Sequence, residues 1–218
     1  MSENAQVFMA LPGRTQDARE VFRGALGEVV RAVGLEVGPA EPGGGREWEG
    51  RVRLALRRAC AQGLSLSGEA FAALVGAAVH DPDPSFNRQF LEPALNAFGK
   101  RRVRSALLAY LRTGTDAERA GAARAWYWSA LPLRMPLVRA QSPSEDGPDV
   151  TAEWYEAALR EFVRNENLDV RRCLLPGLPL WKSFHPERLH DLVDTVVAVA
   201  RAHPDDYLRH RVEHQVRE

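Results

Sequence analysis

The chain has 218 residues, of which 45% are hydrophobic and 27% charged, and its 29 basic residues balance 29 acidic ones. This apolar content is enough for one folded domain or a short repeat array. A protein whose main task is to grip nucleic acid usually carries a basic excess, because neutralising phosphates dominates that affinity. The zero net charge therefore disfavours a nucleic-acid binder, although one face could still be basic.

Residues 1–15 contain nothing that can anchor a core, and we expect them to be flexible. They also lack the charged segment and apolar run of a signal peptide. The longest apolar stretch, at residues 196–200, is too short to cross a bilayer. We therefore expect a cytoplasmic protein without a membrane partner.

Residues 16–66 are predicted to form an N-terminal helical cap. Phe22, Leu26, Val29 and Val33 recur at helical spacing and predict a helix over residues 16–33. A second apolar stripe predicts a helix over residues 48–62. Residues 38–45, which are almost entirely glycine and proline, cannot continue a helix and are predicted to be a linker.

From residue 67 to residue 218, a helix, a short break and a second helix recur. The second helices begin where Ser or Asp stands three residues before an arginine, at Ser85/Arg88, Asp116/Arg119, Asp169/Arg172 and Asp206/Arg209. Ser and Asp side chains near a helix start accept free backbone N–H groups, so we expect them to cap these helices. The series is interrupted by a proline-rich, polar stretch at residues 132–149, which predicts an inserted loop whose residues 136–149 are mobile.

The second helices resemble HEAT repeats, above all Asn-Leu-Asp-Val-Arg-Arg-Cys-Leu-Leu at residues 167–175. The hallmark of that family is an Asp followed closely by Val-Arg, and the other three marks have Asn87, Glu118 and Leu208 in place of the valine. The resemblance implies an all-α superhelix of stacked helical hairpins (HEAT-like repeats). It also implies that the Asp and Arg side chains link adjacent repeats. Independently of any family, one amphipathic hairpin cannot bury both of its faces, whereas stacked hairpins can.

The tryptophans are the most unusual candidates for a binding surface. Successive residues of a helix point about 100° apart, so Trp126, Tyr127 and Trp128 cannot all lie in the core. One of them is expected either at an interface, where Trp and Tyr are favoured anchors, or packed beneath the inserted loop. Trp181 follows Pro176 and Pro179, and it either lines a groove or covers the stack.

Other clusters have simpler interpretations. Lys100, Arg101, Arg102 and Arg104 surround Val103 and form either an anion contact or a solvated face. His210 and His214 are spaced to share a metal, but a third ligand is not apparent. Cys60 and Cys173 both fall on apolar helix faces and cannot make a Cys-based zinc site. We find no catalytic motif and no cofactor fingerprint, and we expect no metal, no cofactor and no catalytic residue.

The sequence thus predicts a non-catalytic binding or scaffold protein that presents a concave helical-repeat surface to a protein or peptide partner. The candidate binding residues are Arg119, Trp126, Trp128, Arg172 and Trp181. The alternative is a nucleic-acid-acting protein that is similar to the alkylpurine DNA glycosylases built from HEAT-like repeats. Those enzymes place tryptophans and an aspartate beside basic residues, and Asp169 would be the aspartate here, although the spacing does not match.

Overall fold

The computed structural model describes residues 16–40, 44–133, 139–140 and 149–216. Within them the chain is all-α, as predicted, and its two short strands form one parallel pair, β1 (Ser65–Leu66) with β2 (Arg139–Ala140). The helices are α1 (Gln16–Val33), α2 (Gly45–Ala61), α3 (Gly68–His80), α4 (Arg88–Phe98), α5 (Lys100–Thr113), α6 (Asp116–Ser129), α7 (Thr151–Arg164), α8 (Leu168–Leu174), α9 (His190–Arg201) and α10 (Asp206–Gln215). Three short 3₁₀ helices, Leu175–Gly177, Lys182–Phe184 and Glu187–Leu189, connect α8 to α9.

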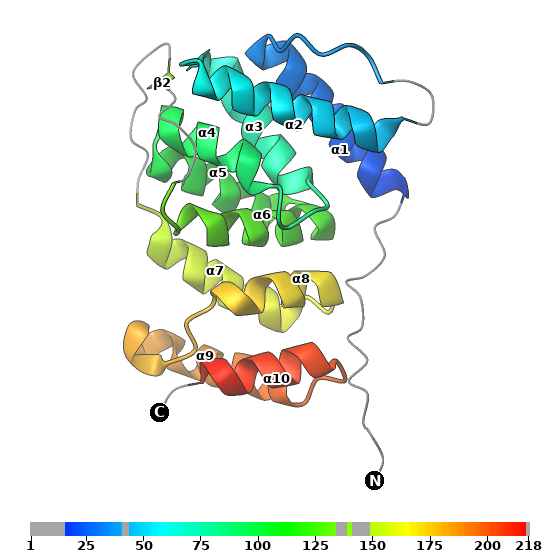
Figure 1. Ribbon diagram of the computed structural model, residues 1–218. Helices are drawn as coiled ribbons and strands as arrows, with labels where there is room; N and C mark the ends of the chain where they lie inside the picture. The colour runs from blue at the N-terminus through cyan, green and yellow to red at the C-terminus, as the bar shows by residue number, and fades with distance from the viewer. Residues whose placement is uncertain (1–15, 41–43, 134–138, 141–148, 217–218) are drawn as a thin grey trace.

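Consecutive helices pack in pairs, and the pairs contact one another in chain order. α5 packs on α6, α7 on α8 and α9 on α10, while α6 also contacts α8, and α7 contacts both α5 and α9. Figure 1 shows these three pairs one below another, with α1 to α4 above them. The N-terminal helices join this arrangement through α3 and α4, which contact α5 and α6, while α1 packs along α3. Each layer therefore buries its apolar faces against the layers beside it.

The apolar stripes found in the sequence are the faces that become buried. Phe22, Leu26 and Val29 of α1 are fully buried, and the Phe22 ring meets Phe90 of α4 edge-on with centroids 6.1 Å apart. The buried faces of the later helices follow the same spacing and consist of Val103, Leu107 and Leu111 on α5, Ala158, Leu159 and Phe162 on α7, and Val193, Val196 and Ala200 on α9. Burial of this kind is the main term that stabilises a helical domain, because helices of this length are marginal on their own.

The caps of the second helices differ from the expectation. The capping side chain lies one or two residues before the Asp that the sequence pattern singled out. Thr115, Asn167 and Asp205 accept the backbone N–H groups at the starts of α6, α8 and α10, and Thr115 forms a reciprocal capping box with Glu118. Asp169 is therefore not the cap of α8, because Asn167 already accepts the N–H groups of residues 169 and 170. At α4, Ser85 precedes the helix by three residues and Asn87 makes no side-chain cap.

Several expectations fall on residues outside the described part of the chain. The predicted flexible N-terminus (1–15), part of the predicted linker (41–43) and most of the inserted loop (134–138 and 141–148) belong to this group. Of the inserted loop, residues 139–140 pair with β1, and Asp149 accepts hydrogen bonds from the backbone N–H and the hydroxyl of Thr151 at the start of α7. Among the described helices, none is both long enough and apolar enough to span a bilayer.

Candidate functional site

A groove of about 700 Å³ lies where α6 and α8 pack side by side. Its walls come from the start of α1, the end of α3 and the connection from α3 to α4, and its floor comes from α6 and α8. Most of the lining is apolar. The lining residues are Ala18, Val21, Val79, His80, Pro82, Pro84, Thr115, Ala117, Glu118, Arg124, Tyr127, Trp128, Asp169, Arg172, Cys173 and Pro176. We call this cavity the α6–α8 groove.

Two helical stripes form the floor of the groove. On α6 the stripe consists of Ala117, Arg124 and Trp128. On α8 it consists of Asp169, Arg172 and Cys173, and Pro176 of the following 3₁₀ helix extends it. The spacings are those of side chains that share one face of a helix. Gly121 lies within the α6 stripe, where a Cβ atom would stand only 1.9 Å from the carbonyl oxygen of Val79. The missing side chain therefore allows the end of α3 to approach α6 and close one wall of the groove.

Aromatic side chains form one end of the groove. The indole Nε1 of Trp128 donates a hydrogen bond to the carbonyl oxygen of Pro84 (3.1 Å), and the Arg88 guanidinium lies 5.1 Å from the centre of the Trp128 ring. The Tyr127 ring meets that indole edge-on at 5.5 Å and remains 46% exposed. Trp128 is thus a fixed wall, whereas Tyr127 offers its ring to a ligand.

Arg124 is the cation on the groove floor. Its Nη2 donates to the backbone oxygen of Asp81 at 3.3 Å, and its Nη1 lies 3.4 Å from the Sγ atom of Cys173. The nearest carboxylate in an ion pair with it is Asp169, at 3.8 Å, which is too long for a good hydrogen bond. The side chain is 17% exposed, and its Nε is buried without a hydrogen-bond partner. The guanidinium is therefore held in place with spare donor capacity.

The thiol on the same floor is not poised for reaction. Burial raises the pKa of Cys173 to about 11, against the smaller opposing effect of Arg124. The thiol therefore stays protonated at neutral pH, and it is the thiolate that reacts as a nucleophile or binds metal. Cys173 instead contributes polarisable packing surface and a weak contact between its Sγ and Oδ1 of Asp169 at 3.7 Å.

His80 and Glu118 occupy the end of the groove nearest the start of α6. The Nε2 atom of His80 lies 3.7 Å from Oε1 of Glu118. Burial lowers the pKa of His80, against the opposing charge of Glu118, so the imidazole is neutral at pH 7. The pKa of Glu118 is lowered mainly by the backbone N–H of Thr115, which donates to its carboxylate at 2.7 Å. This end of the groove therefore carries the negative charge of Glu118 beside a neutral imidazole.

Two of the five candidate residues from the sequence, Trp128 and Arg172, line the groove. Arg172 is only 7% exposed and binds both carboxylate oxygens of Asp205, with its Nε donating at 3.1 Å. Asp205 also accepts the backbone N–H of Leu208. Arg172 therefore ties α8 to the start of α10, which agrees with the linking role that the resemblance implied for this arginine.

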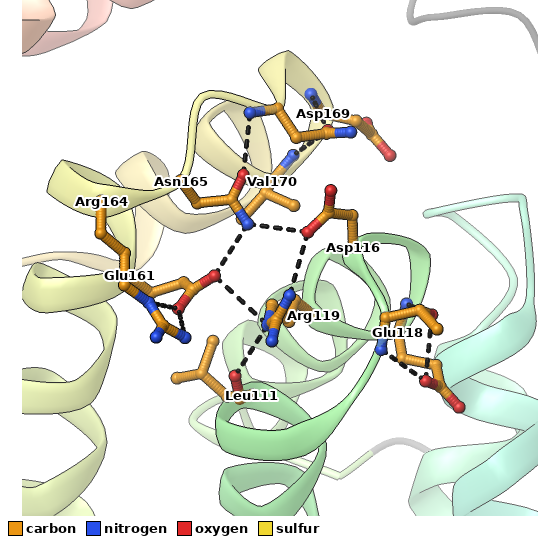
Figure 2. A network of polar contacts seen from close by, with 11 residues as sticks. Leu111, Asp116, Glu118, Arg119, Glu161, Arg164, Asn165, Asp169 and Val170 are labelled. Atoms are coloured by element: carbon orange, nitrogen blue, oxygen red, sulfur yellow. Dashed lines mark hydrogen bonds and ion pairs between the residues drawn. The ribbon is translucent and has the colours of Figure 1, made fainter.

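Arg119 does not line the groove, because it points toward α7 (Figure 2). Its Nη1 donates to Asp116 at 3.0 Å, and its Nε lies 3.2 Å from Oε1 of buried Glu161 and 3.3 Å from the backbone oxygen of Leu111. Asn165 completes the network by donating to Asp116 and Glu161 at 2.7 and 2.8 Å. The network links the α5–α6 pair to the α7–α8 pair, so Arg119 serves the packing of the layers.

Trp126 and Trp181 also lie outside the groove. The Trp126 ring is buried and stacks on Trp154 of α7, with centroids 4.1 Å apart and an interplanar angle of 2°. The guanidinium of Arg104 lies 4.5 Å from the centre of that ring, so this cation is not simply solvated. Trp181 is 38% exposed and meets Phe184 edge-on at 5.7 Å, on the connection between α8 and α9. The structure therefore does not bring the five candidates together at one site.

The histidine pair and the two cysteines noted in the sequence do not form a metal site or a disulfide in the described part of the chain. His210 and His214 contact each other edge-on with ring centroids 4.4 Å apart, and no group of three metal-ligating side chains occurs in the described part of the chain. Cys60 and Cys173 are both free thiols.

The sequence did not point to Arg124 as a groove residue or to Tyr127 as the exposed aromatic. It also did not show that the α3–α4 connection forms a wall of the groove. The one available signal for Arg124 was its spacing of four residues from Trp128 on the same helix.

Comparisons of the chain with protein-family models, with curated proteins and with solved structures found no match. The α6–α8 groove is therefore the feature of the chain that bears on its function.

Proposed function

We propose that this protein is a non-catalytic binding protein, built as a HEAT-like stack of helical hairpins, which holds a segment of a protein partner in the α6–α8 groove. The observation that carries the proposal is the groove itself, about 700 Å³ in volume and lined mainly by apolar side chains. Grooves of this composition between helices are common ligand sites. Tyr127, exposed beside the fixed Trp128, is the type of residue that dominates binding energy at interfaces.

The titratable groups of the groove favour binding over catalysis. Cys173 is protonated at neutral pH, and the charged ends of Glu118 and Asp169 face His80 and Arg124 rather than a nucleophile. Such groups orient and select a ligand.

One observation favours the alternative of a nucleic-acid-acting protein. Trp128, Arg124 and Asp169 line the same groove, and an indole beside an aspartate and an arginine suits an unstacked base. Against this, the groove also carries the carboxylates of Glu118 and Asp169, and the whole chain has no net charge. A phosphate backbone would meet these two carboxylates, and the chain as a whole has no basic excess to offset them. A protein segment therefore suits the groove better.

The test is site-specific photo-crosslinking in cells. A benzophenone amino acid at position 127 is compared with the same amino acid at position 54, because Leu54 is exposed on α2 and does not line the groove. We expect a protein that is captured from position 127 and absent from position 54.

The captured protein is then purified and its affinity measured with variants. Tyr127→Ala should weaken binding by about 2 kcal/mol, or roughly 30-fold in Kd. Val21→Glu, at a position that lines the groove and is 52% exposed, should weaken it as well, whereas Leu54→Glu should not. Equal capture from both positions, or unchanged affinity of both groove variants, would contradict the proposal. Tight binding of duplex DNA that weakens steeply with salt would favour the alternative.

A further inference from the structure

Arg124 differs from the other arginine on the groove floor in how completely it is paired. Arg172 binds both oxygens of a buried carboxylate, Asp205. Arg124 has one backbone oxygen at 3.3 Å, one thiol at 3.4 Å and a carboxylate no nearer than 3.8 Å, while its Nε has no partner. A mostly buried guanidinium loses its hydration and normally recovers the loss through hydrogen bonds. At Arg124 that recovery is incomplete.

The surroundings of Arg124 would strengthen a pairing with an incoming anion. Val79, Pro82 and Pro84 on one wall and Pro176 on the other are apolar, so a segment that fills the groove would leave the guanidinium with mainly apolar neighbours. Charges attract each other more strongly in such surroundings than in bulk water. A guanidinium also presents its donors in a planar fork that matches the two oxygens of a carboxylate.

We propose that Arg124 is the point at which the groove recognises a single carboxylate on an otherwise apolar peptide segment of the partner. The carboxylate is that of an Asp or Glu side chain, flanked by apolar residues that contact Tyr127 and the wall formed by Pro82 and Pro84. This inference rests on the proposed function and deepens it by naming the chemistry that the groove selects.

The charges of the groove explain why one carboxylate suits it and a polyanion does not. Arg124 is the less completely paired of the two arginines in the groove, since Arg172 binds both oxygens of Asp205 whereas the Arg124 contacts are 3.3–3.8 Å long. Glu118 and Asp169 line the same groove and repel additional negative groups. A peptide with one acidic side chain places its charge at Arg124 and leaves apolar atoms against the rest of the lining.

The experiment is a selection of displayed random 12-residue peptides on the full-length protein, run in parallel on Arg124→Met and on Arg112→Met. Arg112 is a matched control because it is an exposed arginine, paired with Glu153, that does not line the groove. Peptides selected on the natural protein and on Arg112→Met should be enriched at least threefold over the starting library in an acidic residue flanked by apolar ones. Selection on Arg124→Met should lose this enrichment.

One enriched peptide is then measured against its amide version, with Asp→Asn or Glu→Gln. The natural protein should bind the acidic form at least tenfold more tightly, and Arg124→Met should bind both forms equally within twofold. Arg124→Lys, which keeps the charge but loses the fork, should show an intermediate preference. The melting temperatures of both Arg124 variants establish that they fold.

The outcomes separate this inference from the proposed function. Peptides that bind more weakly to Tyr127→Ala but carry no acidic preference, or keep it on Arg124→Met, would overturn the role of Arg124 and leave the groove as the binding site. Failure to enrich any peptide, or binding that is indifferent to Tyr127→Ala, would overturn both. A 12-base-pair DNA duplex that binds more tightly than any peptide would also overturn both.

Discussion

Replacing Asp205 by Ala should destabilise the protein strongly, because Asp205 both pairs with a buried arginine and caps a helix. Asp205 accepts hydrogen bonds from Arg172 and from the backbone N–H of Leu208, and both Asp205 and Arg172 are less than 8% exposed. Breaking a buried ion pair from one side costs about 3–5 kcal/mol, because the other charge remains buried. Loss of the cap of α10 adds about 0.5–2 kcal/mol. Together these approach the whole stability of a typical domain, roughly 5–15 kcal/mol.

The assay is urea unfolding followed by the circular dichroism of the helices. Asp206→Ala is the matched neighbour, because Asp206 contacts Arg209 but its side chain is 89% exposed, and we expect almost no change there. The double variant Asp205→Ala with Arg172→Met should recover much of the loss, since it removes the unpaired guanidinium. The reasoning is wrong if Asp205→Ala and Asp206→Ala unfold at the same urea concentration, or if the double variant is as unstable as the sum of its single changes.

The same pair predicts how stability responds to acid. Burial by itself raises the pKa of Asp205. The hydrogen bonds from Arg172 and from the N–H of Leu208, together with the charge of Arg172, lower that pKa by more, so it lies below the ordinary value. A carboxylate with a lowered folded-state pKa contributes stability above its unfolded pKa and loses it as the pH falls through the folded value. The natural protein should therefore lose stability steeply on acidification below about pH 4, the ordinary aspartate pKa. Asp205→Ala should show a shallower decline.

Two pairs of substitutions test the close approach of α3 to α6 and the cap of α8. Gly121→Ala should lower the melting temperature, with a cost of about 1–3 kcal/mol for forcing α3 and α6 apart, because the new methyl group would overlap the Val79 carbonyl. Gly50→Ala in α2 is its control, since nothing lies within 4 Å of that position, and it should stabilise by about 0.5–1 kcal/mol; equal effects of the two changes would contradict the close approach. Asn167→Ala should cost about 0.5–2 kcal/mol in urea unfolding as the cap of α8, and Asp169→Ala should cost less, whereas the opposite order would restore Asp169 as the cap.

Features set by local spacing were predictable from the sequence. The bounds of α1 and its buried face follow from Phe22, Leu26 and Val29, because the 3.6-residue period alone decides which side chains share a face. The caps were misplaced by one or two residues, since Asp occurs both at a cap and in the first turn that follows it. Adjacent polar residues such as Asn167 and Asp169 compete for that role, and the sequence pattern alone does not separate them.

The groove could not be predicted in the same way, because it depends on which face of α6 meets a neighbour. Side chains two residues apart on a helix point about 200° from each other, so Trp126 and Trp128 had to lie on nearly opposite faces. The stack on Trp154 takes Trp126 to the α7 side, and the approach of α3 at Gly121 leaves Trp128 to the groove. That choice is made by tertiary contacts between segments far apart in the chain.

The arginines of this protein show why residue type and position are insufficient to separate a structural from a functional role. Arg119 and Arg172 each follow an Asp by three residues near the start of a helix, and each has its guanidinium bound to carboxylates of its own or a neighbouring layer. Arg124 belongs to the same helix as Arg119, yet it retains a buried Nε without a partner. An arginine whose donors are already occupied gains little from a ligand anion, whereas one with unsatisfied donors on an apolar floor gains a strong contact. The pairing of each guanidinium in the folded chain is therefore what distinguishes an arginine that holds the layers together from one that is available to bind.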